Sequence, residues 1–239
     1  MSDLQTLRRV ALAGVLLAVV LGGASTALIF ASVGDFEAFT FGHVDTILRA
    51  GPQAAPLWRW AMLTDMLFSY LLLAPLALYG HRLLRERKPW LADLGLFGAL
   101  AYITLGAASA ASLAIAGSSL IESYGAASPE QQVAIVTSFT LLRDVFYYAI
   151  WQTVDAITLG TWLFASGWLL LSDRPRLGRL LVVLGGGTWS GGLMTMVGVH
   201  SLAVVALIFG AALGLWLLWL VVYARRGPGQ PMDAVRGPA

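Results

Sequence analysis

The sequence is marked first by what it lacks. The 239-residue chain contains no cysteine, which excludes disulfides, zinc–thiolate sites, iron–sulfur clusters and thiol nucleophiles. Only 12% of its residues are charged, whereas about 25% are charged in a soluble domain. The net charge is only +2 and the basic residues are scattered, which excludes nucleic acid as a partner. With 58% hydrophobic residues, the composition predicts a polytopic membrane protein that is embedded in a lipid bilayer.

Long uncharged runs recur along the chain, each near the roughly 20 apolar residues that a helix needs to cross a bilayer. They predict an all-α fold, a single six-transmembrane-helix bundle over residues 1–226. The last two runs almost touch, which predicts a tight hairpin near Gly198. A tail rich in glycine and proline, residues 227–239, is expected to be disordered on the cytoplasmic side. The predicted spans are residues 10–33, 57–79, 94–121, 150–171, 180–199 and 202–223.

Basic residues mark one side of the predicted bundle. They cluster before the first run, between the second and third, between the fourth and fifth, and after the sixth. Six spans put all four clusters on the cytoplasmic side, with both termini, whereas five spans would place one cluster outside. The first run is longer than the 7–15 residues usual in a signal peptide, which favours a membrane anchor over a cleaved signal.

The outer connections are unequal. Residues 34–56 mix phenylalanines and aliphatic residues with acidic ones, which predicts a short amphipathic segment lying on the membrane surface or capping the bundle. Further on, Ser128, Pro129 and Gln131 form a helix-start pattern with a capping box. The fourth helix should therefore begin outside the membrane and run for about 40 residues, or bend near the interface.

Two aspartates interrupt the apolar runs, Asp65 in the second and Asp155 in the fourth. An ionised side chain near the bilayer centre costs about 2.5–3.5 kcal/mol, so these residues are the natural functional candidates. At about 1.5 Å per residue, both carboxylates are expected in the outer half of the membrane.

A polar and aromatic stripe is predicted along the fourth helix. In an ideal α-helix, Asp155 lies about 20° from Asp144, three turns earlier. Such a face avoids lipid and should line the bundle interior or a water-filled cleft. Arg143 and Tyr147 flank one edge of this stripe, and Gln152 flanks the other. The other members of the stripe are Thr137, Thr140, Tyr148, Trp151, Thr158 and Trp162.

These residues predict a polar cavity in the outer half of the bundle. The glycine-rich residues 185–192 allow close backbone approach, a kink or contact with a ligand. In an alternative interpretation, the aspartates only hydrogen-bond across helices and the aromatic residues form the usual interfacial belt. The predicted lining is Asp65, Tyr148, Trp151, Gln152, Asp155, Trp189 and Ser190, and the predicted rim is Arg143, Asp144 and His200.

Several chemistries fit less well. Ser190 and His200 would lie about 15 Å apart on a continuous helix, too far for the pair of a serine protease. His81 and His200 are predicted on opposite sides of the membrane, so they cannot share a haem. His43 and Asp45 could join His200 in a metal or pigment site only if the outer loop folds over the bundle. No zinc-protease or P-loop motif occurs, and no metal, cofactor or catalytic residue is predicted.

Two stretches of the chain carry a resemblance. The run from Asp65 to Arg87 contains Ala-Leu-Tyr-Gly-His-Arg-Leu-Leu-Arg, and the run from Gly160 to Gly187 joins Gly-Trp-Leu-Leu-Leu to a glycine cluster through a short basic loop. Together they resemble bacterial six-helix membrane proteins grouped as a domain of unknown function. This resemblance implies a six-helix topology in a bacterial cytoplasmic membrane, and it transfers no catalytic residue.

Three functions are compatible with these features. The first is binding or transport of a small molecule or lipid through the outer cavity. The alternative is a non-catalytic accessory subunit that packs against a membrane-protein partner through faces of small residues. An intramembrane enzyme is the third, although no nucleophile, acid and base are forced together. The small residues are Gly14, Ala18 and Gly22 in one helix and Gly106, Ala110, Ala114 and Ser118 in another.

Overall fold

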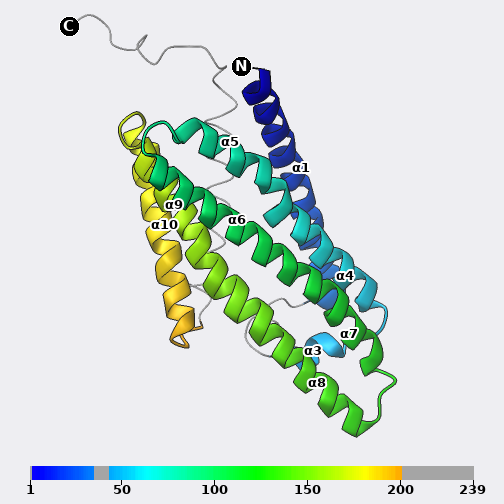
Figure 1. The fold of residues 1–239 in the computed structure, drawn as a ribbon. Helices are drawn as coiled ribbons and strands as arrows, with labels where there is room; N and C mark the ends of the chain where they lie inside the picture. Colours follow the sequence, from blue (N-terminus) through cyan, green and yellow to red (C-terminus); the bar gives the residue numbers. More distant parts are fainter. Residues whose placement is uncertain (1, 35–42, 201–239) are drawn as a thin grey trace, which may run out of the picture.

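The computed structural model of the chain describes residues 2–34 and 43–200. Within these residues every regular element is a helix, which confirms the predicted all-α class. The long helices run side by side as one elongated bundle (Figure 1). The elements are α1 (Ser2–Val33), α3 (Val44–Leu48), α4 (Ala54–Asp65), η1 (Met66–Tyr70), η2 (Leu71–Leu73), α5 (Ala74–Leu84), α6 (Pro89–Ser112), η3 (Leu113–Gly117), α7 (Ser118–Tyr124), α8 (Pro129–Arg143), η4 (Asp144–Val154), α9 (Asp155–Leu170) and α10 (Pro175–Met196).

Four continuous helical stretches are long and apolar enough to cross a membrane, which indicates a membrane protein. They are longer than the predicted apolar runs, because backbone hydrogen bonds continue where the side chains become polar. The fifth long helix, α10, has 22 residues, but its glycines and arginines make it less apolar. The predicted sixth span, residues 202–223, and the tail, residues 227–239, lie outside the described residues. The four stretches are Asp3–Val33, Ala54–Leu84, Pro89–Tyr124 and Pro129–Leu170.

Charged loops gather at one end of the bundle. The start of α1, the loop between α5 and α6, and the loop between α9 and α10 all lie at this end (Figure 1). Together with the adjoining turns of α5 and α10, these segments carry most of the arginines and the only lysine, Lys88. We call it the basic end, and we call the other end, with α3 and the turn between α7 and α8, the far end.

The small-residue faces pack within the chain. A Cβ atom added at Gly14 would lie 2.9 Å from the Leu72 carbonyl oxygen, and one at Gly22 would lie 3.2 Å from the Phe68 ring. On α6, Gly106 faces the Tyr70 ring so closely that no side chain would fit. Ala18, Ala110, Ala114 and Ser118 are all buried.

Two local predictions at the far end are confirmed. The backbone N–H of Gln131 donates to Ser128 Oγ at 3.4 Å, and that of Ser128 donates to Gln131 Oε1 at 2.9 Å, which completes the capping box. The helix that starts there runs without a break for 42 residues. After α10, the backbone of Gly198 takes a positive φ of 82°, which ends the helix; the second half of the predicted hairpin lies outside the described residues.

The long connection between α1 and α4 contains the amphipathic helix α3. Its apolar residues Val44, Ile47 and Leu48 are buried in the protein, where α3 contacts α7 and α8. Asp45 and Arg49 form an exposed ion pair of 3.1 Å. In the described part of this connection, therefore, α3 caps the bundle rather than lying on lipid.

Three long helices contain π-helical segments: η1, η3 and η4. A π turn holds more residues than an α turn because its hydrogen bonds join residues i and i+5. The longest segment, η4, has 11 residues. The side chains in and beyond η4 therefore point in directions that differ from those of an ideal α-helix.

Candidate functional site

Asp155 is the most unusual side chain in the bundle. It is the first residue of α9, it is 3% exposed, and it lies beside the Tyr70 hydroxyl. Neither carboxylate oxygen makes a hydrogen bond of ordinary geometry to any described residue. Because buried polar atoms in proteins are nearly always hydrogen-bonded, these two oxygens require an explanation.

Two tyrosines that the sequence analysis missed lie next to Asp155. The ring centroids of Tyr70 and Tyr102 are 5.0 Å apart, and both hydroxyls interact electrostatically with Asp155 and Asp65. At about 1.5 Å per residue, Tyr70, Tyr102 and Asp155 all lie roughly 20 Å from the basic end. We call Asp65, Tyr70, Tyr102 and Asp155 the acid–tyrosine cluster.

Asp65 has a different environment from Asp155. It is half-buried and its Oδ1 accepts a hydrogen bond of 3.0 Å from Ser69 Oγ. The structure thus brings the two predicted carboxylates to one region of the bundle. They differ in that Asp65 accepts a hydrogen bond from Ser69, whereas Asp155 accepts none of ordinary geometry.

Both carboxylates adjoin π-helical segments. Asp65 directly precedes η1, which ends at Tyr70, and Asp155 directly follows η4. Single π turns inside α-helices occur frequently at functional sites, because they displace side chains from the regular pattern. The local backbone therefore turns both the acids and Tyr70 out of the α-helical register.

The π segment η4 also changes the predicted stripe. Thr137 and Asp144 are exposed, whereas Phe139, Arg143 and Tyr147 are buried, so the prediction for the first part of this helix is wrong. An α-helix rotates a four-residue spacing by about 40° at each step, and the wider π turns compensate for this rotation. The buried line takes every fourth residue: Phe139, Arg143, Tyr147, Trp151, Asp155, Leu159 and Leu163.

Trp151 contacts Tyr70 of the cluster, and Gln152 is the next residue along η4. Gln152 is 3% exposed, and its Oε1 has no hydrogen bond within the described residues. Trp151 Nε1 donates to the Gly106 carbonyl oxygen at 3.3 Å, and its ring stacks on Tyr70 with centroids 6.5 Å apart. The two Asp155 oxygens and Gln152 Oε1 are thus buried acceptors without a hydrogen bond of ordinary geometry in the described residues, although the Tyr70 hydroxyl lies beside Asp155.

The predicted rim residues do come together. Arg143 donates hydrogen bonds to Asp144 Oδ1 from Nε at 3.0 Å and from Nη2 at 2.6 Å. Its guanidinium lies 5.3 Å from the Tyr148 ring centroid. The rings of Tyr148 and His200 are 4.2 Å apart. These contacts connect the end of α8 with His200, which follows α10.

Trp189 and Ser190 do not join the acid–tyrosine cluster. Trp189 Nε1 donates to the Ile157 carbonyl oxygen at 2.8 Å and to Thr161 Oγ1 at 3.2 Å, and its ring stacks on Phe164. These contacts lie roughly 180–240° around α9 from Asp155. Ser190 is exposed and donates to its own helix at the Gly186 carbonyl oxygen, 3.0 Å away. Trp189 therefore packs α10 against α9, whereas Ser190 lies on the exposed surface of α10.

The histidines lie apart in the described part of the chain. His43 precedes α3 and is exposed, and His81 Nε2 lies 2.8 Å from Asp93 Oδ1 at the basic end. No three histidine or acidic side chains of residues 2–34 and 43–200 are grouped so that they could hold a metal ion.

The fold and the cluster define the class of the protein: an α-helical membrane protein with acidic and aromatic side chains buried between its helices. No family model, curated protein or solved structure matches the chain.

Proposed function

We propose that the protein binds or carries a small molecule with N–H or O–H donors, an ammonium group included, at Asp155 and Gln152. The observation that supports this proposal is the set of three buried acceptor oxygens without hydrogen bonds in the described residues. An unsatisfied buried acceptor costs about 1–3 kcal/mol, and a bound donor removes that cost.

Beyond the Tyr70 hydroxyl, which lies beside Asp155, the rest of the chain offers few donors for these oxygens. The apolar run of residues 202–223 contains no Ser, Thr, Asn, Gln, His, Lys or Arg. Its side-chain donors are the two indole N–H groups of Trp216 and Trp219 and the hydroxyl of Tyr223 at its end. A ligand or water molecule is therefore the more general source of the missing hydrogen bonds.

The aromatic rings around Asp155 favour a cation among possible ligands. Tyr70, Tyr102, Tyr147 and Trp151 form a continuous set of ring contacts with centroids 5.0–6.5 Å apart. The faces of such rings attract ammonium groups, and a carboxylate completes the recognition of one. An organic ammonium compound is thus the best match to the cluster.

The substitution Asp155→Asn tests this proposal. We expect retention of octylammonium, measured by native mass spectrometry from a nanodisc, to fall about tenfold, because one charge-assisted hydrogen bond is lost. Asp93→Asn is the matched control, since it makes the same change on an exposed carboxylate at the basic end, and it should leave retention unchanged. Equal retention by wild type and Asp155→Asn would contradict the proposal.

The alternative of an accessory subunit predicts a different spectrum, in which the chain carries another protein and no small molecule. The small-residue faces that suggested this alternative are filled by contacts within the chain, at Gly14, Gly22 and Gly106.

The proposed topology has six spans, with both termini on the cytoplasmic side of a bacterial inner membrane, as the resemblance to the six-helix family implies. Its support is that the start of α1 and two basic loops lie at one end of the bundle (Figure 1), which the positive-inside rule assigns to the cytoplasm.

Cysteine labelling tests the orientation, because the chain has no cysteine of its own. Glu86 at the basic end and Ala126 at the far end are both exposed. We expect a membrane-impermeant maleimide to label Ala126→Cys in intact spheroplasts, and Glu86→Cys only after lysis. The reverse pattern would show an inverted orientation, and labelling of both before lysis would contradict a membrane-spanning bundle.

A further inference from the structure

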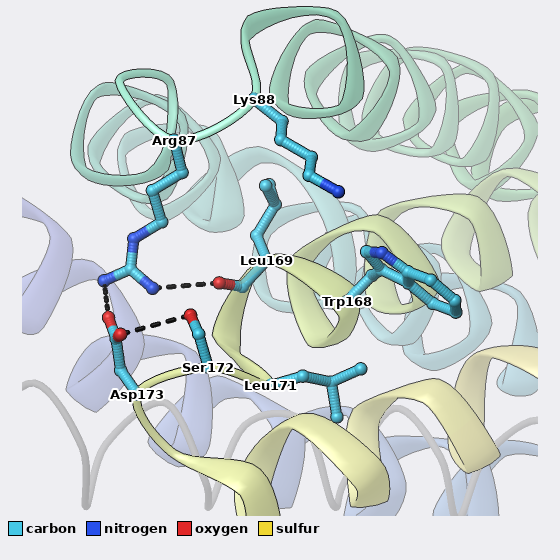
Figure 2. A pocket seen from close by; sticks show the side chains of 7 residues that line it. All are labelled: Arg87, Lys88, Trp168, Leu169, Leu171, Ser172 and Asp173. Atoms are coloured by element: carbon cyan, nitrogen blue, oxygen red, sulfur yellow. Dashed lines mark hydrogen bonds and ion pairs between the residues drawn. The ribbon is translucent and has the colours of Figure 1, made fainter.

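A second feature, far from the acid–tyrosine cluster, is an open pocket at the basic end. It has a volume of about 570 Å³ and lies between the loop that joins α5 to α6 and the end of α9 (Figure 2). Its wall contains charged side chains from both loops and apolar side chains from the last turn of α9.

One wall of the pocket is held by Arg87. Its Nη1 donates to the Leu169 carbonyl oxygen at 2.9 Å, and its Nη2 pairs with the Asp173 carboxylate. Ser172 Oγ donates to the same carboxylate at 3.1 Å. These contacts, drawn in Figure 2, join the two loops, and Asp173 balances the charge of Arg87.

Lys88 supplies the remaining positive charge. Its side chain extends from the loop across the pocket in the direction of Leu169 and Trp168 (Figure 2). No hydrogen bond or ion pair joins its ammonium group to another residue of the described chain. The pocket therefore has a net charge of +1, carried by a group that is free to meet an anion.

The position of the pocket matches the surface of a bilayer. Trp168 is 46% exposed in its wall, and Trp90, two residues after Lys88, is 67% exposed at the same end. Tryptophans concentrate at the level of lipid headgroups. Leu169, Leu171 and Trp168 also give the pocket an apolar side, so its occupant should be polar at one end and apolar at the other.

We propose that this pocket binds the phosphate group of an anionic phospholipid, with Lys88 as its charge partner. An ammonium group contacts phosphate as a point charge, and basic pockets between membrane helices bind anionic headgroups. The apolar wall takes the glycerol and the first part of an acyl chain. This proposal does not depend on the function of the acid–tyrosine cluster.

The test compares Lys88→Gln with Arg176→Gln. Both substitutions remove one positive charge from the basic end, and Arg176 is exposed and lies outside the pocket wall. In nanodiscs that contain phosphatidylglycerol and phosphatidylcholine, we expect Lys88→Gln to lower the phosphatidylglycerol retained in native mass spectra roughly fivefold. Arg176→Gln should change it less than twofold. Equal losses in the two variants would overturn the site and leave only a general surface charge.

A second readout uses Lys88 as the only lysine of the chain. An amine-reactive reagent should modify it several times more slowly in phosphatidylglycerol than in phosphatidylcholine, relative to a reference lysine introduced as Arg176→Lys. Inorganic phosphate is then added to the phosphatidylcholine discs. Little protection by phosphate supports a lipid, whereas protection as strong as that by phosphatidylglycerol would overturn the lipid as the occupant.

Discussion

Gly185→Ala is expected to destabilise the bundle by about 2–3 kcal/mol, because it forces α9 and α10 apart. A Cβ atom at this position would lie 2.7 Å from the carbonyl oxygen of Gly160 and 2.7 Å from the backbone nitrogen of Phe164. Both obstacles are backbone atoms, so no rotation of a side chain can relieve the clash. The contact is reciprocal, since a Cβ atom at Gly160 would lie 2.8 Å from the Gly185 carbonyl oxygen.

Gly186→Ala is the matched control for that substitution. The two glycines are adjacent on α10, and a Cβ atom at Gly186 would meet no other group within 4 Å. Alanine favours the helix over glycine by up to about 1 kcal/mol, so this variant should keep or raise the thermal unfolding midpoint in detergent. If the two variants had the same midpoint, close packing at Gly185 would not stabilise the pair of helices.

The sequence predicted features that depend on local patterns. Apolar runs of sufficient length indicated the first four spans, and the capping box at Ser128 indicated where the longest helix begins. Such features follow from the composition of one segment, and no other helix is needed to form them. Close backbone approach was one of the three uses predicted for the glycines of residues 185–192, and Gly185 and Gly192 have it.

The sequence did not predict the π-helical segments, because their extra residues have no local signature. Periodicity of an ideal α-helix therefore placed Asp144 and Thr137 on the buried face, where the structure has Arg143 and Phe139. The error accumulates along η4, since every π turn adds to the difference in rotation.

The candidate site was predicted in part for a similar reason. Asp65 and Asp155 stand out in apolar runs because charges are costly there. Tyr70 and Tyr102 do not stand out, since tyrosines are common in membrane helices near the interface. Only the packing of three helices shows that these tyrosines lie beside Asp155. Trp189 was assigned to the same cavity, but its contacts lie on another face of α9.

Asp155→Leu is expected to stabilise the empty protein by about 1–3 kcal/mol, although it removes the proposed ligand contact. Leucine branches at Cγ as aspartate does, so it occupies a similar shape without oxygens that need hydrogen bonds. The cost that it removes is that of burying two acceptor oxygens that make no hydrogen bond of ordinary geometry in the described chain. The thermal unfolding midpoint in detergent, with and without octylammonium, measures both effects.

Asp65→Leu separates this effect from a general benefit of apolar residues in a membrane helix. Asp65 is half-buried and already accepts a hydrogen bond from Ser69, so its replacement leaves a donor unpaired and should bring little or no gain. A higher midpoint for Asp155→Leu would support the proposed binding role of Asp155, since residues at functional sites are often unfavourable for folding. If Asp155→Leu instead lowered the midpoint, the carboxylate would be a structural hydrogen-bonding group, and the case for a ligand at Asp155 and Gln152 would fail.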